Sequence, residues 1–396
     1  MPARRGVDVK VLVLSHLYPN SYAPASGTFV HNQLRFLKEH CSIEVAAPVP
    51  WFPFPGFGRW SAYRRVPRVE VMDGLRICHP RRLALPRRIL FARQWRFHLK
   101  ALERCDLAAP DLVHAHCAYP DGLAAVEYGA RNGKPVVITV HGFDIKSLPR
   151  LDPRWRRLTV EALERADAVV AVSRDLRSDV LELGVGAGKV RWIPNGVDCR
   201  LFSAAVSRRP GEGGWRLLYV GRFVEEKGLR VLLEALALIR RRRSDVSLTL
   251  IGGHPASGTS EPFLPQVAAL GLSECVEFRD AVPPEEMPRH MAASDLVVLP
   301  SFYDSFGIVL IEAMACGLPV VATRCGGPEE MVDDATGRLV AVGDSEDLAE
   351  GILAVLDEYG GYDREEIRRR AGERYDYRRA AARIHALYEE VLEGKA

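Results

Sequence analysis

The sequence predicts an α/β protein with two domains, each built on a parallel sheet. Short runs rich in Val, Leu and Ile alternate with segments of helical periodicity along most of the 396 residues. Strands that are apolar on both faces and separated by helices are typical of parallel sheets covered by helices on either side. A polar stretch rich in Gly and without periodicity, Ser203–Gly214, separates the two series and indicates a linker.

In the first half we expect strands at Val9–Ser15, Ile43–Val49, Leu112–His116, Val136–Val140, Ala168–Val172 and Val190–Pro194. The helical patterns of this half lie at Thr28–Glu39, Gly122–Ala130, Arg154–Ala166 and Asp175–Leu183. In the second half we expect strands at Arg216–Val220, Ser247–Ile251, Val276–Arg279, Leu296–Leu299 and Pro319–Ala322. Its helical patterns lie at Gly228–Arg240, Pro284–Ala293, Phe306–Cys316 and Ala371–Ala396.

The composition excludes several classes of protein. Hydrophobic residues make up 47% and charged residues 27% of the chain, which is typical of a globular domain in water. A net charge of +3 is too small to indicate a nucleic-acid partner. We find no apolar run long enough to span a membrane, and the apolar run Val9–Leu14 is too short for a signal peptide. The eight cysteines contain no C-x2-C pair, so we expect neither a zinc site nor a disulfide framework, and a reducing, cytoplasmic setting.

Residues 50–104 interrupt the alternation of strands and helices. A proline-punctuated aromatic stretch, Pro50–Phe57, is followed by ten arginines between Arg64 and Arg96, opposed only by Glu70 and Asp73. Two interpretations remain open. The segment is either a solvated basic face over a loop insertion or a patch that contacts an anionic or lipid-linked partner at a membrane surface.

The most informative segment is residues 299–327, which reads LPSFYDSFGIVLIEAMACGLPVVATRCGG. A buried strand is followed by a polar loop, a helix that opens at Ser305-Phe306-Gly307, and a second strand. A strand–helix–strand unit of this kind binds ligands at the N-terminus of its helix. Asp304 and Glu312 are eight residues apart, so on a continuous helix they would project within about 80° of each other and about 12 Å apart. This spacing suits the two ends of one extended ligand.

Two cations follow the first strand of the second domain. Arg222 leaves the end of this strand, and Lys227 stands just before the next helix. Ligands of open parallel sheets bind at the carboxyl edge of the strands. Two cations beside a helix N-terminus would suit a diphosphate group, so we favour a binding role over a solvated surface.

The first domain offers weaker candidates. His141 follows a strand and precedes a glycine, whereas His114 and His116 are interpreted as core residues. Gly27 stands where the first helix opens, and the free amides there could bind a phosphate.

Several nucleotide-binding motifs are absent from the sequence. We find no G-x-G-x-x-G after the first strand and no P-loop, which argues against a standard dinucleotide or nucleotide-triphosphate site. The Asp-x-Asp pair that commonly binds a nucleotide-bound divalent metal is also missing. We therefore expect no metal and no cofactor.

The chain resembles the retaining glycosyltransferases of the GT-B fold, specifically glycosyltransferase family 4, the large group 1 family. The resemblance extends over nearly the full length. The matching stretches are PSFYDSFGIVLIEAMACGLPVVATRCGG, YVGRFVEEKG, IPNGVD, VHGFD and SGTFVHNQLRFL, in the family's order and spacing. Near the N-terminus, SHLYPNSYAPASGTFVHNQL and VAAPVPWFP are similar to members that make cell-surface polysaccharides of the teichuronic-acid type.

The resemblance implies two Rossmann-like, doubly wound domains that face each other across a cleft. An acceptor-binding domain would span residues 1–200 and a sugar-nucleotide-binding domain residues 201–375. The last helix, residues 376–396, would cross back to the first domain. Asn195 falls in the family's motif at the domain boundary, where its role is either structural or catalytic.

The resemblance also implies roles for individual residues. Arg222 and Lys227 would hold the donor diphosphate, and Glu312 would hold the ribose hydroxyls. The backbone amides that would face the phosphates belong to Phe306, Gly307, Ile308 and Val309. Gly27 would approach the diphosphate from the first domain, and His141 would contact the transferred sugar. Where the family usually has Glu this chain has Asp304, which is about 1.5 Å shorter. We expect Asp304 to contact the donor sugar. To compensate for the shorter side chain, either the helix starts at a shifted position or the donor sugar differs from that of other family members.

The function expected from the resemblance is a metal-independent transfer of a sugar, with retention, from a UDP- or GDP-sugar to a glycan or lipid-linked acceptor. The enzyme would work in the cytoplasm at the inner face of the membrane, with a peripheral contact through residues 50–104 and no nucleic acid. No second carboxylate stands beside His141 at the spacing of a double-displacement pair, so the sequence gives little support to a covalent intermediate. Two alternatives remain: a sugar-nucleotide epimerase of the same fold, and a nucleotide-sugar-binding protein without turnover.

Overall fold

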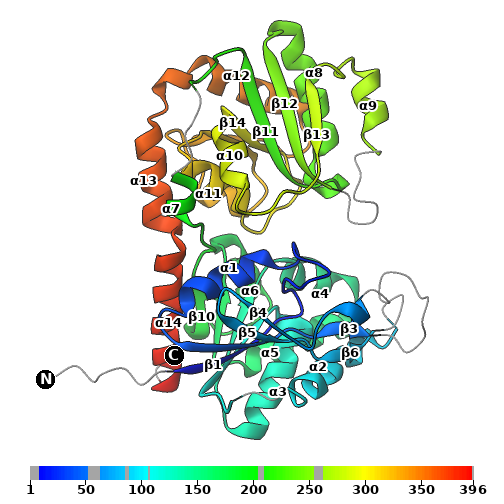
Figure 1. Cartoon of the computed structure of the whole chain (residues 1–396), viewed down its shortest axis with the longest axis vertical. Helices are drawn as coiled ribbons and strands as arrows, with labels where there is room; N and C mark the ends of the chain where they lie inside the picture. Colours follow the sequence, from blue (N-terminus) through cyan, green and yellow to red (C-terminus); the bar gives the residue numbers. More distant parts are fainter. Residues whose placement is uncertain are drawn as a thin grey trace, which may run out of the picture. The chain divides into compact units, whose positions relative to one another are not determined.

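The computed structural model describes residues 9–51, 63–84, 89–105, 108–203, 209–253 and 262–394. The chain divides into two compact α/β units (Figure 1). The N-terminal unit comprises Met1–Asn195 and Tyr377–Ala396, and the C-terminal unit comprises Gly196–Asp376. The border between them precedes the stretch that we predicted as a linker, of which residues 204–208 lie outside the described residues.

The N-terminal unit contains an eight-stranded sheet with the order β10-β9-β8-β7-β1-β2-β5-β4. All neighbouring strands are parallel except β4 and β5. The strands are β1 (Lys10–Leu14), β2 (Ser42–Ala46), β4 (Val69–Met72), β5 (Leu75–Cys78), β7 (Leu112–His116), β8 (Val136–Val140), β9 (Ala168–Ala171) and β10 (Val190–Trp192). A separate parallel pair is formed by β3 (Val49–Trp51) and β6 (Arg81–Leu83).

The helices of this unit are α1 (Thr28–Leu37), α2 (Gln94–Leu102), α3 (Leu123–Asn132), α4 (Leu148–Leu151), α5 (Pro153–Arg165), α6 (Arg174–Glu182) and α14 (Tyr377–Leu392). Short helical turns are η3 (Phe91–Arg93), η4 (Ala118–Gly122), η5 (Phe143–Ser147) and η6 (Ala187–Lys189). The last helix of the chain, α14, packs beside α1. Its Ile384, Leu387 and Tyr388 belong to the same buried cluster as Val13 and Leu34, so the C-terminal helix is part of the core of this unit.

The C-terminal unit contains a six-stranded, fully parallel sheet with the order β13-β12-β11-β14-β15-β16. The strands are β11 (Trp215–Arg222), β12 (Val246–Gly253), β13 (Val276–Arg279), β14 (Leu296–Leu299), β15 (Val320–Thr323) and β16 (Gly337–Val340). The helices are α7 (Cys199–Ser203), α8 (Leu229–Arg242), α9 (Leu264–Ala269), α10 (Met287–Ala292), α11 (Ile308–Ala315), α12 (Ser345–Asp357) and α13 (Arg364–Tyr375). Short turns are η7 (Glu225–Lys227), η8 (Gly327–Glu330) and η9 (Tyr359–Gly361).

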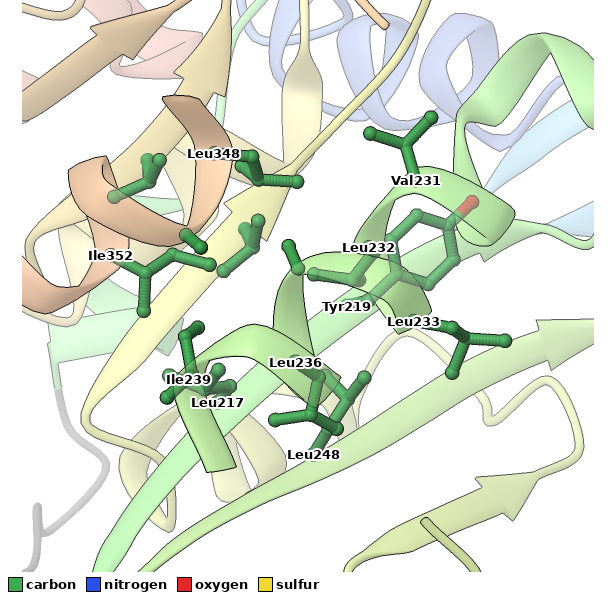
Figure 2. Packing of buried hydrophobic residues seen from close by; sticks show 14 of the residues in the cluster. Leu217, Tyr219, Val231, Leu232, Leu233, Leu236, Ile239, Leu248, Leu348 and Ile352 are labelled. Atoms are coloured by element: carbon green, nitrogen blue, oxygen red, sulfur yellow. The ribbon is translucent and has the colours of Figure 1, made fainter. Parts of the chain in front are cut away.

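One face of α8 holds much of the core of the C-terminal unit (Figure 2). Leu229, Leu232, Leu236 and Ile239 recur at helical spacing, and each is fully buried. Burying such a side chain contributes roughly 1.5–3 kcal/mol. The polar residues of α8 point away from this core. The apolar face of the helix packs on β11 and β12 and so fixes the ends of these strands, which precede the loops.

The predicted fold class is confirmed, because both units are Rossmann-like parallel sheets covered by helices. The prediction missed β3, β4, β5, β6 and α2 in the region of residues 49–104. It also missed α4, α7, α9, α12, β16 and most of α13. The greater part of the predicted aromatic stretch, residues 52–57, lies outside the described residues.

Two local findings complete the description. We expected no disulfide framework, and the structure contains a single disulfide in the described residues, between Cys78 at the end of β5 and Cys105 after α2. Cysteine spacing gave no indication of this pair, since only the fold brings the two residues together. Within the described ranges, we find no helix with both the length and the apolar character that a membrane crossing requires.

Candidate active site

The C-terminal unit places the predicted donor residues where its strand order reverses. Strand β11 lies between β12 and β14, so the connections leave its carboxyl end toward opposite sides. Such a switch point opens a crevice in which parallel sheets bind ligands. Arg222 is the last residue of β11 and its side chain is exposed, while Asp304 lies in the loop that follows β14.

Lys227 and Asp304 form an ion pair at this edge. The Lys227 Nζ lies 2.7 Å from the Asp304 Oδ2, and both side chains are mostly buried. Gly228, which follows Lys227, has φ near +69°, and a Cβ there would lie 1.9 Å from the Pro300 carbonyl oxygen. The glycine therefore allows the loop of Lys227 to pack directly against the end of β14.

Asp304 also binds the backbone at the start of α11. Its Oδ1 accepts hydrogen bonds from the amides of Phe306, at 3.1 Å, and Gly307, at 2.8 Å. Asp304 therefore already occupies two of the four amides that we predicted to face the donor phosphates. The amides of Ile308 and Val309 belong to the first turn of α11, which has no intrahelical acceptor for them.

The predicted helical spacing of Asp304 and Glu312 is wrong. The helix α11 begins at Ile308, and Gly307 before it has φ near +87°. Asp304 is extended, with an isolated parallel bridge to Gly326. The angle and rise expected for eight helical residues therefore do not apply, because a left-handed glycine separates the carboxylate from the helix.

Glu312 lies in the middle of α11, on the partly exposed side of an otherwise buried helix. Burial raises the pKa of its carboxyl to about 8. Among the described residues we find no hydrogen bond or ion pair to this carboxyl. A carboxyl group that is withdrawn from water and lacks a protein partner is suited to bind the hydroxyl groups of a ligand.

His141 follows β8 in the N-terminal unit and is half-buried. Its Nε2 lies 3.0 Å from the Nδ1 of His116, and the two rings stack with centroids 5.2 Å apart. The backbone amides of His141 and Gly142 donate to the carboxylate of Asp144 at 3.1 and 3.0 Å. Burial lowers the pKa of His141 to about 3, so the ring is neutral at physiological pH.

The core interpretation of His114 and His116 is confirmed, because both are fully buried. The Nδ1 of His114 lies 2.6 Å from the Tyr388 hydroxyl of α14, and its Nε2 lies 2.7 Å from the Thr139 hydroxyl. The rings of His114 and His116 lie 4.5 Å apart. The core of the N-terminal unit thus supports His141 through a continuous row of rings.

Gly27 and Asn195 are also in the N-terminal unit. Gly27 caps α1 with φ near +65°, and a Cβ there would lie 2.2 Å from the Leu17 carbonyl oxygen. The loop of Leu17 therefore packs directly on the start of the helix. Asn195 is buried at the border of the unit.

Sequence reasoning missed a second polar cluster in this unit. The sheet order reverses between β1 and β7, and His16 and Asp121 follow these two strands. The Asp121 carboxylate lies 2.5 Å from the Nδ1 of His16 and 2.6 Å from the Nδ1 of His98. Burial disfavours ionisation of Asp121, but the two histidines outweigh it and hold its pKa well below the usual range. The only signal in the sequence was that His16 and Asp121 each follow an apolar strand, because their contact depends on the strand order.

His16 also lines a cavity of about 180 Å³ at this switch point, together with Asn20, Ser26, Tyr63 and Arg82. We call it the His16 cavity. The His16 side chain is 24% exposed, and its Nδ1 is fixed by Asp121. The ring orientation is thus set by a buried carboxylate, which leaves the other ring nitrogen for a ligand.

Among the described residues, no group of three or more His, Cys, Asp and Glu side chains could hold a metal ion.

Two family models match the chain. Residues 3–201 match the model described as Glycosyltransferase Family 4, and residues 214–358 match the model described as Glycosyl transferases group 1. The fold and these matches define the class: the chain belongs to the group 1, family 4 glycosyltransferases.

The chain is similar to several other members of this family. A teichuronic acid biosynthesis glycosyltransferase, TuaC, of Bacillus subtilis (strain 168) is 29% identical over 87% of this chain and 88% of the relative. A D-inositol 3-phosphate glycosyltransferase of Paenarthrobacter aurescens (strain TC1) is 30% identical over 72% of this chain and 74% of the relative.

Solved structures show the same GT-B fold. Sucrose-phosphate synthase from Thermosynechococcus elongatus has a TM-score of 0.78 at 21% identity, covering 98% of this chain and 100% of that one. Anabaena Alr3699/HepE, solved in complex with UDP and glucose, has a TM-score of 0.74 at 20% identity, covering 96% of this chain and 100% of that one.

Proposed function

We propose that the protein is a metal-independent, retaining glycosyltransferase that moves a sugar from a UDP- or GDP-sugar to a hydroxyl of a glycan or lipid-linked acceptor. Its role would be in the synthesis of a cell-surface polysaccharide or glycolipid, in the cytoplasm at the inner face of the membrane. The observation that carries the proposal is the group of Arg222, Lys227 and the α11 N-terminus around one switch point. The teichuronic acid relative and the UDP-bound structural neighbour support it.

The chemistry requires a site that stabilises negative charge. When the glycosidic bond to the nucleotide breaks, charge develops on the departing diphosphate. Fixed cations and helix-terminal amides stabilise such charge. Since the sequence lacks the Asp-x-Asp pair that would bind a divalent metal, we propose that side chains and amides of the protein supply this stabilisation. In the proposed reaction Arg222 and Lys227 supply the cations, and Glu312 binds the ribose hydroxyls.

Asp304 has to change partners when the donor binds. Its carboxylate now pairs with Lys227 and with the amides of Phe306 and Gly307. The donor diphosphate offers the same groups more negative charge and more acceptor atoms, so it competes for them. The released Asp304 would then bind hydroxyls of the donor sugar.

The proposed transfer needs no general acid from His141. A ring with a pKa of about 3 is neutral at physiological pH and is no effective general acid, but it can hydrogen-bond a sugar hydroxyl. The acceptor hydroxyl would attack from the face that the diphosphate leaves. The proton of this hydroxyl would pass to the departing phosphate oxygen. Because attack and departure take place on the same face, the configuration of the sugar is unchanged.

A thermal-shift screen of sugar nucleotides identifies the donor, and substitutions then test the site. We expect Arg222→Ala and Lys227→Ala each to lower kcat/KM for the donor roughly 10²- to 10³-fold, the loss typical of a group that stabilises transition-state charge. Arg241→Ala is the matched control, because Arg241 is an exposed residue on α8. Donor kcat/KM that stays near the wild-type value in both site variants would contradict the assignment.

The same measurements separate the proposal from its alternatives. An epimerase would convert its sugar nucleotide with no acceptor present. A binding protein without turnover would give a thermal shift with the donor but no transfer to any acceptor. Transfer that requires both a donor and an acceptor supports the glycosyltransferase.

A further inference from the structure

The N-terminal unit has a second cavity, which lies between β3, β6 and α2. It measures about 480 Å³ and we call it the arginine groove. Its cationic lining residues are Arg68, Arg81, Arg82, Lys100 and Arg104. Its remaining lining residues are Trp51, Leu83 and Phe97, so no carboxylate is among the described residues that line it.

The cations of the groove have no carboxylate among the described residues that line it, although the charge of the buried Asp121 acts on Arg82. Burial, and then the charge of Arg68, lowers the pKa of Arg81. Burial also lowers the pKa of Arg82. The Arg81 Nη1 and the Arg82 Nε are buried and have no hydrogen-bond partner in the described part of the chain. Buried guanidinium N–H groups without acceptors are costly, and an anion that bound there would remove the cost.

Arg82 connects this groove to the His16 cavity. Strands β3 and β6 pair with Pro50 opposite Arg82 and Trp51 opposite Leu83. Pro50 and Arg82 line the His16 cavity, whereas Trp51, Leu83 and Arg82 line the arginine groove. One ligand could therefore place a hydroxyl beside His16 and an anionic group among the arginines.

We propose that the acceptor carries a phosphate or diphosphate group, that the arginine groove binds this group, and that the His16 cavity receives the acceptor's sugar or alcohol end. The inference rests on the proposed function, because it names the chemical class of the acceptor. Planar guanidinium groups match phosphate oxygens in geometry and charge. The half-buried Trp51, Leu83 and Phe97 give the groove an apolar wall, which suits an alkyl chain next to the phosphate.

Titration calorimetry with inorganic diphosphate, in the presence of saturating UDP, tests the groove in the full-length protein. Arg68→Gln/Arg104→Gln removes two exposed groove cations, and Arg156→Gln/Arg157→Gln on α5 is a control with the same change in charge. We expect the groove variant to bind diphosphate at least about tenfold more weakly, since a charge-assisted hydrogen bond contributes about 1.5–3 kcal/mol. The control should bind as the wild type does. Arg82→Gln should weaken binding as well.

Flotation with phosphatidylcholine vesicles, with and without phosphatidylglycerol, distinguishes a lipid source of the phosphate from a soluble one. Loss of binding to the anionic vesicles in the groove variant alone assigns the groove to a lipid phosphate. Diphosphate binding without vesicle binding assigns it to a soluble phosphate. Groove and control variants that behave alike in both assays would overturn the inference.

Donor binding, measured on the same variants, separates this inference from the proposed function. We expect the groove variants to bind the sugar nucleotide as the wild type does, because the donor residues are on other strands. If no sugar nucleotide binds to any variant but the groove binds diphosphate, the proposed function fails and the groove stands. If the donor binds and is transferred but the groove variants keep full diphosphate affinity, the groove fails and the function stands.

Discussion

Asp304 and Glu312 place two carboxyl groups of one short segment in opposite surroundings. Asp304 has a cation 2.7 Å away and two backbone amides as donors. Glu312 has no such partner among the described residues, and burial raises its pKa to about 8. Asp304 therefore keeps its partners until a ligand competes for them. Glu312 can bind hydroxyl groups directly, but its carboxyl has to lose a proton before it can accept two hydrogen bonds.

This difference predicts a pH-dependent affinity for the donor. A carboxylate accepts hydrogen bonds from both ribose hydroxyls, whereas a protonated carboxyl has to donate one of its own. Below a pKa of about 8, binding would therefore release a proton from Glu312. We expect the affinity for the nucleotide to rise up to about tenfold per pH unit as the pH approaches 8, and to level off above it. Titration calorimetry with UDP, repeated between about pH 6 and pH 9, measures this dependence.

Glu312→Gln is the control for this dependence. The amide cannot ionise, so any slope that remains in the variant belongs to other groups, including the nucleotide itself. We expect the variant to bind more weakly than the wild type at the high end of the range. A wild-type slope that is unchanged in Glu312→Gln would show that Glu312 does not hold the ribose.

A second prediction at the residue scale concerns His116, which we propose positions His141. The Nε2 of His116 is buried without a partner, and its Nδ1 contacts the Nε2 of His141. His116→Phe keeps a stacked ring and removes the buried Nε2, which has no hydrogen-bond partner in the described part of the chain. We therefore expect the free energy of unfolding to stay the same or to rise. We expect kcat to fall roughly 10- to 100-fold with little change in the donor KM, because His141 loses its orientation.

Denaturant unfolding and steady-state kinetics on the same protein check this prediction. A loss of stability and activity together would indicate a purely structural role for His116. Unchanged kcat would exclude the positioning role. His40→Phe is the control, because His40 is an exposed histidine of the same unit.

At the scale of elements, the arrangement of the proposed donor site depends on how closely the turn before α8 approaches the end of β14. A Cβ at Gly228 would lie 1.9 Å from the Pro300 carbonyl oxygen, and the residue has φ near +69°. We expect Gly228→Ala to destabilise the protein by several kcal/mol, of which the left-handed conformation accounts for about 1–2 kcal/mol. Gly372→Ala should instead stabilise α13 by up to about 1 kcal/mol, because nothing lies within 4 Å of its added Cβ. Denaturant unfolding of both variants compares them, and equal effects would refute the packing argument.

The elements that the sequence predicted well are those buried on both faces. Strands such as β8 and β14 consist only of buried residues, so their apolar runs are unmistakable. The missed strand β4 is an edge strand in which Val69 and Val71 are exposed. Its apolar residues do not mark a core face, so local pattern could not separate it from a loop.

The positions of the site candidates in the fold were predictable where a motif carried them. The structure places Arg222 at the end of β11 and Lys227 just before α8, as the motif predicted, because both follow one strand and precede one helix within a few residues. His16 and Asp121 were missed because they are 105 residues apart and meet only through the strand order. The pairing of Asp304 with Lys227 was missed for the same reason, since it depends on the contact between two loops.

At the scale of the whole molecule, the two units should respond to acid in opposite directions. Burial lowers the pKa of His98 to about 4 and of His114 and His141 to about 3, and all three are in the N-terminal unit. Between these values and about 6.5, the unfolded state binds protons that the folded unit does not. The stability of the N-terminal unit is therefore fully present above about 6.5 and falls with the pH below it. Glu312 in the C-terminal unit has the opposite sign, because its folded pKa of about 8 lies above that of an unfolded glutamate.

Hydrogen exchange followed by mass spectrometry resolves this difference, because it reports the opening of each unit separately. Each neutral buried histidine contributes at most roughly 1.4 kcal/mol per pH unit, so lowering the pH from about 6.5 to 4.5 should weaken the N-terminal unit by several kcal/mol. Its β7 and β8 amides should lose protection, while those of β14 and β15 keep theirs. His114→Gln should flatten the dependence, since it replaces one titrating ring with a neutral amide. If both units lost protection together, or if the C-terminal unit opened first, the buried histidines would not be the source of acid sensitivity.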